Sequence, residues 1–103
     1  MIAELETLRP QIAALCSQFQ VRRLDVFGSA VSAQRFAPEH SDVDFLVAFN
    51  APSPGTYADQ FFGLQEALSA LLHRPVDLVV ERAIRNPYFR QSVQASRELL
   101  YAA

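Results

Sequence analysis

The stretch DVDFLVAF, residues 42–49, decides the fold because it alternates with a period of two. Its odd-numbered positions are all large and apolar, while its even-numbered positions begin with two aspartates, Asp42 and Asp44. Strict alternation predicts a β-strand with one buried face, and residues two apart point to the same side, roughly 7 Å from each other. The stretch therefore predicts a strand that packs on a core and presents two carboxylates on its other face.

The segments around this strand predict a layered α/β arrangement. Residues 21–27 (VRRLDVF) are rich in β-branched and aromatic residues and end at Gly28, which predicts a strand followed by a turn. Residues 57–72 carry apolar side chains at helical spacing, and Pro75 ends that helix. Residues 76–80 (VDLVV) predict a further buried strand.

Both ends of the chain predict helices. Residues 2–19 place apolar side chains three and four apart. Asn86 followed by Pro87 is typical of a helix start, so we expect a helix over residues 88–101. The expected fold class is α/β (α+β): a single domain, residues 1–103, with a small mixed three-stranded sheet flanked by about four helices.

Composition limits the classes of function. The chain has 103 residues, of which 50% are hydrophobic and 19% charged, which excludes intrinsic disorder. Its net charge of −2 gives no basic field for nucleic acid, so direct nucleic-acid binding is not expected. All nine basic residues are Arg, and chemistry that needs a Lys, such as Schiff bases or Walker A phosphate binding, is excluded.

The single cysteine and the absence of long apolar runs indicate a cytoplasmic protein. Cys16 has no cysteine partner within the chain and lies beside an apolar helical stripe, so we expect a core residue and not a reactive thiol. No apolar run approaches the roughly 20 residues of a membrane span, and the acidic start is unlike a signal peptide. We expect no membrane contact.

A third carboxylate strengthens the case for a metal site. Asp77 lies near the start of the strand at 76–80, and aspartate is depleted in strands. Each of Asp42, Asp44 and Asp77 alone has a structural explanation, such as a turn cap, a solvated face or an edge position. Together they predict a site for Mg²⁺ or Mn²⁺, because neighbouring carboxylates repel unless a cation neutralises them. Two such ions can activate a hydroxyl and neutralise a triphosphate.

The dipeptide Gly28-Ser29 supplies a candidate phosphate-binding turn. Glycine allows the backbone to approach a ligand closely, and a serine hydroxyl beside free backbone N–H groups suits an anion. Ser29 precedes Asp42 by thirteen residues, enough for a short helix and a return loop. Alone, a Gly-Ser pair after a strand is usually only a turn. Its position before the aspartate strand is what indicates phosphate binding.

The combination resembles the minimal nucleotidyltransferases (MNT proteins) of the polymerase-β-like superfamily, which are often antitoxins paired with a HEPN-domain toxin. The matching residues are Gly28-Ser29, the run Ser41-Asp42-Val43-Asp44 and the run Val76-Asp77-Leu78-Val79, and the resemblance covers nearly the whole chain. It implies a polymerase-β-like nucleotidyltransferase fold.

The resemblance also implies roles for individual residues. Gly28 and Ser29 would bind phosphate, Asp42 and Asp44 would hold the metal ions, and Asp77 would be the third metal-binding carboxylate that activates the acceptor hydroxyl. The implied reaction transfers AMP from ATP, with Mg²⁺ or Mn²⁺, to a tyrosine hydroxyl of a HEPN toxin. That modification silences an RNase, and the two proteins would form a hetero-oligomer.

One departure from the family keeps other functions open. Many members carry Arg and Gly soon after the Gly-Ser pair, whereas here the first arginine is Arg35, a later candidate for the triphosphate. The alternative function is a non-catalytic antitoxin that neutralises its partner by occlusion. Transfer to a small molecule or to RNA is a third hypothesis, disfavoured by the missing extra domain and basic patch.

Arginines and aromatic residues late in the chain have two interpretations. Arg82, Arg85, Arg90 and Arg97 form a solvated face by default, with a partner-binding or triphosphate role as the alternative. The aromatic residues exceed what so small a core needs, and some would suit a partner interface.

Overall fold

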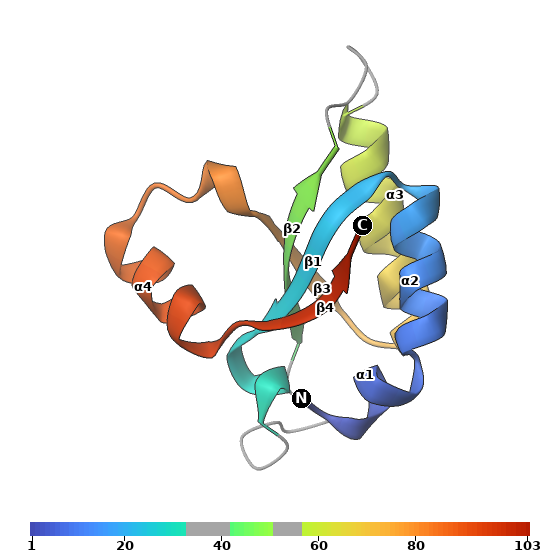
Figure 1. Cartoon of the computed structure of the whole chain (residues 1–103), viewed down its shortest axis with the longest axis horizontal. Helices are drawn as coiled ribbons and strands as arrows, with labels where there is room; N and C mark the ends of the chain where they lie inside the picture. The colour runs from blue at the N-terminus through green and yellow to red at the C-terminus, as the bar shows by residue number, and fades with distance from the viewer. Residues whose placement is uncertain (33–41, 51–56) are drawn as a thin grey trace.

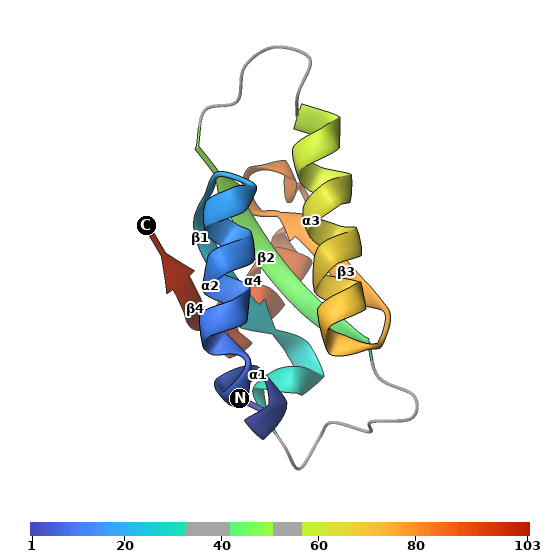
Figure 2. The same ribbon diagram turned by 90° about the vertical axis from the view of Figure 1, so that its right-hand side faces the viewer.

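A computed structural model describes residues 1–32, 42–50 and 57–103. Within these residues the chain forms a four-stranded sheet in the order β3-β2-β1-β4, with helices on both faces (Figures 1 and 2). Its helices and strands, with η for short 3-10 helices, are α1 (Ala3–Thr7), α2 (Arg9–Gln18), β1 (Val21–Phe27), η1 (Gly28–Val31), β2 (Val43–Phe49), α3 (Tyr57–Leu72), β3 (Val76–Val80), η2 (Glu81–Ala83), α4 (Pro87–Ser96) and β4 (Glu98–Ala102).

Helices α2 and α3 cover one face of the sheet, and α4 lies on the opposite face (Figure 2). The alternation in β2 explains both layers. Val43, Phe45 and Val47 are fully buried in the main core with α2 and α3, as predicted. On the other face Leu46 joins a smaller cluster of buried residues made by Phe27, Leu46, Ile84 and Val93. The sheet is therefore buried on both sides at its centre, and only its ends and edges remain open to ligands.

The connections bring three strand ends to one side of the molecule. β1 and β2 are antiparallel, whereas α3 forms a crossover that makes β3 parallel to β2. The carboxyl end of β1 therefore lies beside the amino ends of β2 and β3. In the register, Phe27 pairs with Asp44, and Asp44 pairs with Asp77.

The prediction of three strands and a helix over residues 88–101 is wrong beyond Ser96. The helix begins as predicted, since the Asn86 side chain accepts hydrogen bonds from the backbone N–H groups two and three residues on, at 2.8 and 3.2 Å. It ends at Ser96, and the following residues form β4 along β1. Leu99 is 47% exposed and Leu100 4%, an alternation that suits a strand. The otherwise open edge of β1 outweighs helix propensity here.

The fold confirms that Cys16 is a core residue. Cys16 is fully buried in the main core, where burial raises the pKa of its thiol to about 12, so it stays protonated and inert as predicted. None of the helices in the described part of the chain has the length and apolar character to cross a membrane.

His73 stores backbone strain that a glycine would remove. This exposed residue follows the last residue of α3 and has a φ of +55°, in the left-handed region. We expect His73→Gly to raise the free energy of unfolding by about 0.5–1 kcal/mol, because glycine adopts this conformation without a Cβ penalty. Thermal melts would measure the gain. His73→Ala is the control: it retains the strain, and an equal gain there would show that the imidazole and not the backbone is responsible.

Candidate functional site

The sheet brings two of the predicted carboxylates side by side. Asp44 is the second residue of β2 and Asp77 the second residue of β3, and they are direct partners in the parallel register. Neighbouring strands lie about 4.8 Å apart, and register partners point to the same face. Asp44 and Asp77 consequently share the face of the sheet that carries α4.

Asp42 lies just outside the strand in which it was predicted. β2 begins at Val43, so Asp42 is an exposed residue that precedes the strand. It still influences Asp44: burial and the negative charges of Asp77 and Asp42 together raise the pKa of the Asp44 carboxyl to about 6, with burial the largest cause. The three acids thus form one electrostatically coupled group, with the half-buried Asp44 at its centre.

Gly28 is shaped by its approach to Asp44. It follows Phe27, the β1 partner of Asp44, and its φ is +73°. A Cβ built on Gly28 would lie 2.7 Å from Oδ2 of Asp44, closer than real Cβ atoms approach other atoms. Glycine is therefore required for two reasons: it adopts the positive φ, and it leaves room for the Asp44 carboxylate. Ser29, half-buried, follows in the first turn of η1, so the predicted phosphate turn directly adjoins the carboxylates.

Gly28→Ala should damage the site more than the fold. The left-handed φ costs about 1–2 kcal/mol for a non-glycine residue, and the new methyl group must displace the Asp44 carboxylate. We expect the free energy of unfolding to fall by about that amount, with a change in the titration of Asp44. Denaturant melts and carboxyl-carbon NMR would measure the two effects. An Asp44 carbon whose chemical shift and titration are both unchanged would contradict the contact.

Ser96, which the sequence did not single out, contacts the same turn. Its hydroxyl accepts a hydrogen bond from the backbone N–H of Gly28 at 3.1 Å, from the last turn of α4. The ring of Phe89 also packs edge-to-face on Phe27, with centroids 6.0 Å apart. α4 thereby braces the turn from one side. The predicted helix hid this role, because it placed Ser96 in the middle of a longer helix.

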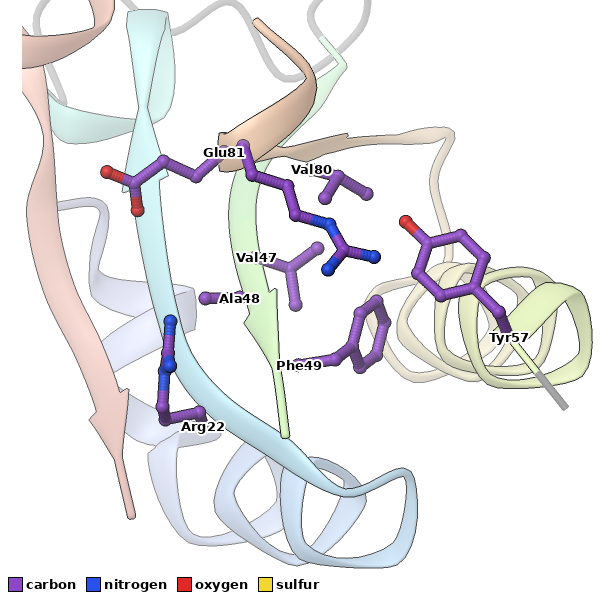
Figure 3. A pocket seen from close by; sticks show the side chains of 8 residues that line it. Arg22, Val47, Ala48, Phe49, Tyr57, Val80 and Glu81 are labelled. Atoms are coloured by element: carbon purple, nitrogen blue, oxygen red, sulfur yellow. The ribbon is translucent and has the colours of Figure 1, made fainter. Parts of the chain in front are cut away.

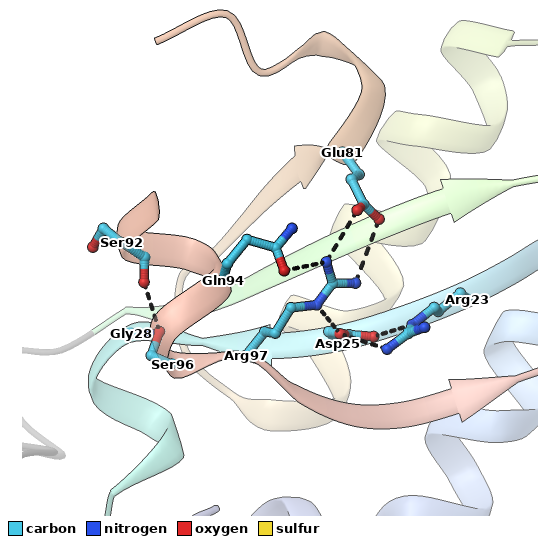
Figure 4. A network of polar contacts seen from close by, with 8 residues as sticks. All are labelled: Arg23, Asp25, Gly28, Glu81, Ser92, Gln94, Ser96 and Arg97. Atoms are coloured by element: carbon cyan, nitrogen blue, oxygen red, sulfur yellow. Dashed lines mark hydrogen bonds and ion pairs between the residues drawn. The ribbon is translucent and has the colours of Figure 1, made fainter. Parts of the chain in front are cut away.

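A buried ion-pair network, also missed, fixes α4 to the sheet (Figure 4). Asp25 in β1 is fully buried and accepts hydrogen bonds from Arg23 and from Arg97. Arg97 also binds Glu81 of η2 at 3.0 Å. Burial alone would raise the pKa of Asp25, but the two guanidinium groups outweigh it and lower the pKa below its usual value. A signal existed: an aspartate inside a strand with an arginine two residues before it on the same face.

The default interpretation of Arg97 as part of a solvated face is therefore wrong. Arg97 is an interior counter-ion and not part of a solvated face. Arg90 donates to the carbonyl oxygen of Ile84 and closes the loop before α4. Arg82 and Arg85 remain exposed.

A pocket of about 390 Å³ lies at the other end of β2 (Figure 3). Ala48 lies on its floor, four residues beyond Asp44 on the same face and so about 13 Å away. The Arg82 guanidinium sits 5.5 Å from the centroid of the Tyr57 ring at its rim. The smaller cluster of buried residues, which includes Leu46, lies between this pocket and the carboxylates. The pocket is therefore not part of the same site.

The chemistry of the acidic side chains suits a divalent cation, but their positions in the described residues do not form a complete set of ligands. Oxygen donors that repel one another, as the raised pKa of Asp44 shows, are those that Mg²⁺ and Mn²⁺ neutralise. In the described residues, however, no three acidic, histidine or cysteine side chains converge to hold one ion. The predicted metal site stays a prediction. Arg35, the predicted triphosphate ligand, lies outside the described residues.

Comparison with known proteins assigns the family. Residues 8–100 match the sequence profile of the nucleotidyltransferase domain. The chain belongs to this nucleotidyltransferase family. The nucleotidyltransferase is 36% identical over 96 residues to a protein of Methanocaldococcus jannaschii provisionally named a protein adenylyltransferase, covering 93% of this chain and 91% of the relative. A second M. jannaschii protein with the same provisional name is 29% identical over the same coverage.

Solved structures agree with the fold of this nucleotidyltransferase. A structure described as a minimal nucleotidyltransferase is 36% identical, has a TM-score of 0.70, and is matched over 91% of this chain and 93% of its own. An MNT antitoxin complex with a tri-AMPylated HEPN toxin of Shewanella oneidensis gives a TM-score of 0.65 at 20% identity, over 96% of this chain and 73% of the other. The second likeness shows the fold alone. The polymerase-β-like minimal fold predicted from the sequence is confirmed, with four strands in place of three.

Proposed function

We propose that this nucleotidyltransferase is an antitoxin that transfers AMP from ATP to a tyrosine hydroxyl of a HEPN-type toxin, with Mg²⁺ or Mn²⁺. The observation that carries the proposal is the register pairing of Asp44 with Asp77 beside Gly28. The names of the relatives support it: M. jannaschii proteins provisionally named protein adenylyltransferases, and an MNT antitoxin solved with an AMPylated HEPN toxin.

The residues divide the chemistry between the two sides of the site. In the reaction the acceptor oxygen bonds to the α-phosphorus of ATP, the bond to the bridging oxygen breaks, and pyrophosphate leaves. Divalent ions held by Asp42, Asp44 and Asp77 would neutralise the triphosphate and lower the pKa of the acceptor hydroxyl. The Ser29 hydroxyl would donate a hydrogen bond to a phosphate oxygen. Ser29 lies in the turn that Gly28 places against Asp44.

The position of Asp77 suits the acceptor side. It is exposed and stands on the edge strand β3, whereas Asp44 is half-buried at the centre of the group. An incoming hydroxyl therefore reaches Asp77 from solvent without passing the phosphate turn. Its carboxylate would orient the hydroxyl and accept its proton.

The experiment that tests this function is a mass measurement on both proteins. The chain is co-purified with a HEPN-domain protein as the acceptor, Mg²⁺ and ATP are added, and the intact masses of both chains are read. We expect one or more AMP units on the HEPN protein. Unchanged masses in a stable complex would refute the transferase proposal.

One observation favours occlusion as a second candidate function. The backbone N–H of Gly28 is already bonded to Ser96, so it is not free for a phosphate in this arrangement. An occluding antitoxin would inhibit its toxin only at a one-to-one ratio, without ATP, and Asp42→Asn would not change the inhibition. A catalytic antitoxin would work at substoichiometric amounts and would require both ATP and Asp42.

A further inference from the structure

The outer edge of β3 is an open strand edge beside the candidate site. β3 is terminal in the sheet, and its inner side pairs with β2, where the Val43 N–H donates to the carbonyl oxygen of Pro75 at 3.2 Å. The carbonyl oxygen of Val76 faces the other way and accepts from the Gln65 side chain at 3.1 Å. Backbone groups of successive residues in a parallel strand alternate in direction. The backbone groups of Leu78 and Val80 consequently point outward like those of Val76.

An apolar groove of about 580 Å³ runs along this edge. Phe61 of α3 lines one side and Phe89 of α4 the other, with Val79 between them. Phe89 is 41% exposed, and its neighbour Tyr88 is 81% exposed. Large exposed aromatic side chains that gather beside an unpaired strand edge are typical of a protein-binding surface. In the described part of the chain, no strand pairs with this edge.

The groove carries positive charge although the whole chain is negative. Arg85 lines it and is exposed, and among the described residues no carboxylate lines the groove. An acidic segment would complement this guanidinium group. The net charge of the chain, −2, makes this local excess informative.

The groove is continuous with the candidate site. Val79 follows Asp77 by two residues in β3, so both side chains are on the same face, about 7 Å apart. A peptide chain seated on the edge therefore passes directly beside the Asp77 carboxylate.

We propose that an extended segment of the acceptor protein, bearing acidic and apolar side chains, pairs with the outer edge of β3 and presents its hydroxyl to Asp77. Its backbone bonds to Leu78 and Val80, an apolar side chain enters the groove between Phe61 and Phe89, and its acids face Arg85. This inference rests on the proposed function for the identity of the acceptor as a protein. It adds the surface that recognises that acceptor.

The sharpest variant is Val80→Pro, because it removes one outward donor and little else. The φ of Val80 is −82°, close to the value that proline imposes, and the preceding residue is in a strand, as proline requires. The N–H that is lost points outward, so the ladder to β2 is retained. Val80→Ala is the matched control, since it trims the same side chain and keeps the N–H.

The assay measures transfer to the HEPN-domain protein and, separately, binding to it without ATP. We expect Val80→Pro to raise the KM for the acceptor about tenfold, with kcat and the KM for ATP unchanged, while Val80→Ala stays within about twofold of the wild type. Should Val80→Pro fail to fold, the exposed Arg85→Glu tests the same surface and should also raise the acceptor KM. An unchanged acceptor KM in a folded Val80→Pro protein overturns the proposal.

The two measurements separate this inference from the proposed function. A wild type that binds the HEPN protein but transfers nothing refutes the transferase, while weaker binding by Val80→Pro still supports the docking edge. A wild type that neither binds nor transfers overturns both. Sedimentation of the chain alone tests a second copy as the occupant: a dimer that Val80→Pro converts to a monomer would overturn the acceptor as the occupant.

Discussion

Asp44→Asn is expected to abolish AMP transfer and yet stabilise the metal-free fold. Transfer should fall by at least 100- to 1,000-fold, in line with the loss of a principal electrostatic group from a reaction centre. In EDTA at pH 7, the melting temperature should rise by a few degrees. Both effects have one cause: Asp44 is half-buried beside two other negative charges, which is unfavourable unless a cation is bound.

The sign of the pH dependence follows from the raised pKa. The folded chain holds a proton on Asp44 up to about pH 6, whereas the unfolded chain loses it near the ordinary value of 3.8. The stability of the wild type therefore falls as the pH rises from about 4 to about 6, and the uncharged Asn avoids that loss. The stability advantage of Asp44→Asn should be present at pH 7 and vanish at pH 4. Calorimetric melts across this range measure it.

Glu66→Gln serves as the control for this prediction, because Glu66 is exposed on α3, which covers the face of the sheet opposite the one that carries Asp44. It should change neither transfer nor the pH dependence of melting. Added Mg²⁺ should reverse the order of stability, since it stabilises the wild type and not the variant. AMP transfer that survives Asp44→Asn would exclude Asp44 as a metal-binding residue.

Arg97→Met is expected to cause a large loss of stability, because Arg97 is a counter-ion of a buried carboxylate. It removes one of the two counter-ions of the fully buried Asp25 and the partner of Glu81. Breaking a buried ion pair from one side costs about 3–5 kcal/mol, and we expect about 3 kcal/mol because Arg23 still contacts Asp25. Urea unfolding at pH 7 would measure the loss.

The same ion-pair network should determine the pH at which the chain unfolds in acid. The pKa of Asp25 is lowered in the folded chain, so its contribution to stability is complete above the unfolded value of 3.8 and is lost as the pH falls through the lowered value. In Arg97→Met the pKa of Asp25 rises, and acid unfolding should begin at higher pH. Arg85→Met, at an exposed position, is the matched control. Equal losses in the two variants would show that Arg97 is no interior counter-ion.

Local patterns in the sequence were sufficient for most of the fold. The alternation in residues 42–49 and the helical spacing in residues 57–72 each depend on neighbours a few positions apart. α3 has the predicted bounds, and β2 begins one residue later than predicted, at Val43. Aspartates near the starts of two strands predicted that Asp44 and Asp77 belong to one site, whereas their direct pairing is known only from the structure. In both strands the signal for a functional site was aspartate, a residue type that is depleted in strands.

The fourth strand depended on a distant partner and so could not be read locally. Residues 98–102 have helical propensity, but the open edge of β1 and the buried carboxylate of Asp25, which binds Arg97, favour an extended chain there. The same tertiary contact placed Ser96 against Gly28. Asp25 itself was overlooked although the sequence showed an aspartate in the middle of a strand.

Paramagnetic broadening of backbone amide resonances by Mn²⁺, bound with a non-hydrolysable ATP analogue, tests whether Asp42, Asp44 and Asp77 form one metal–nucleotide site with Gly28-Ser29. Resonances at residues 28–29, 43–45 and 76–78 should broaden together, and Asp44→Asn should abolish the effect. Absence of broadening, or broadening centred on the pocket near Tyr57 and Arg82, would contradict it.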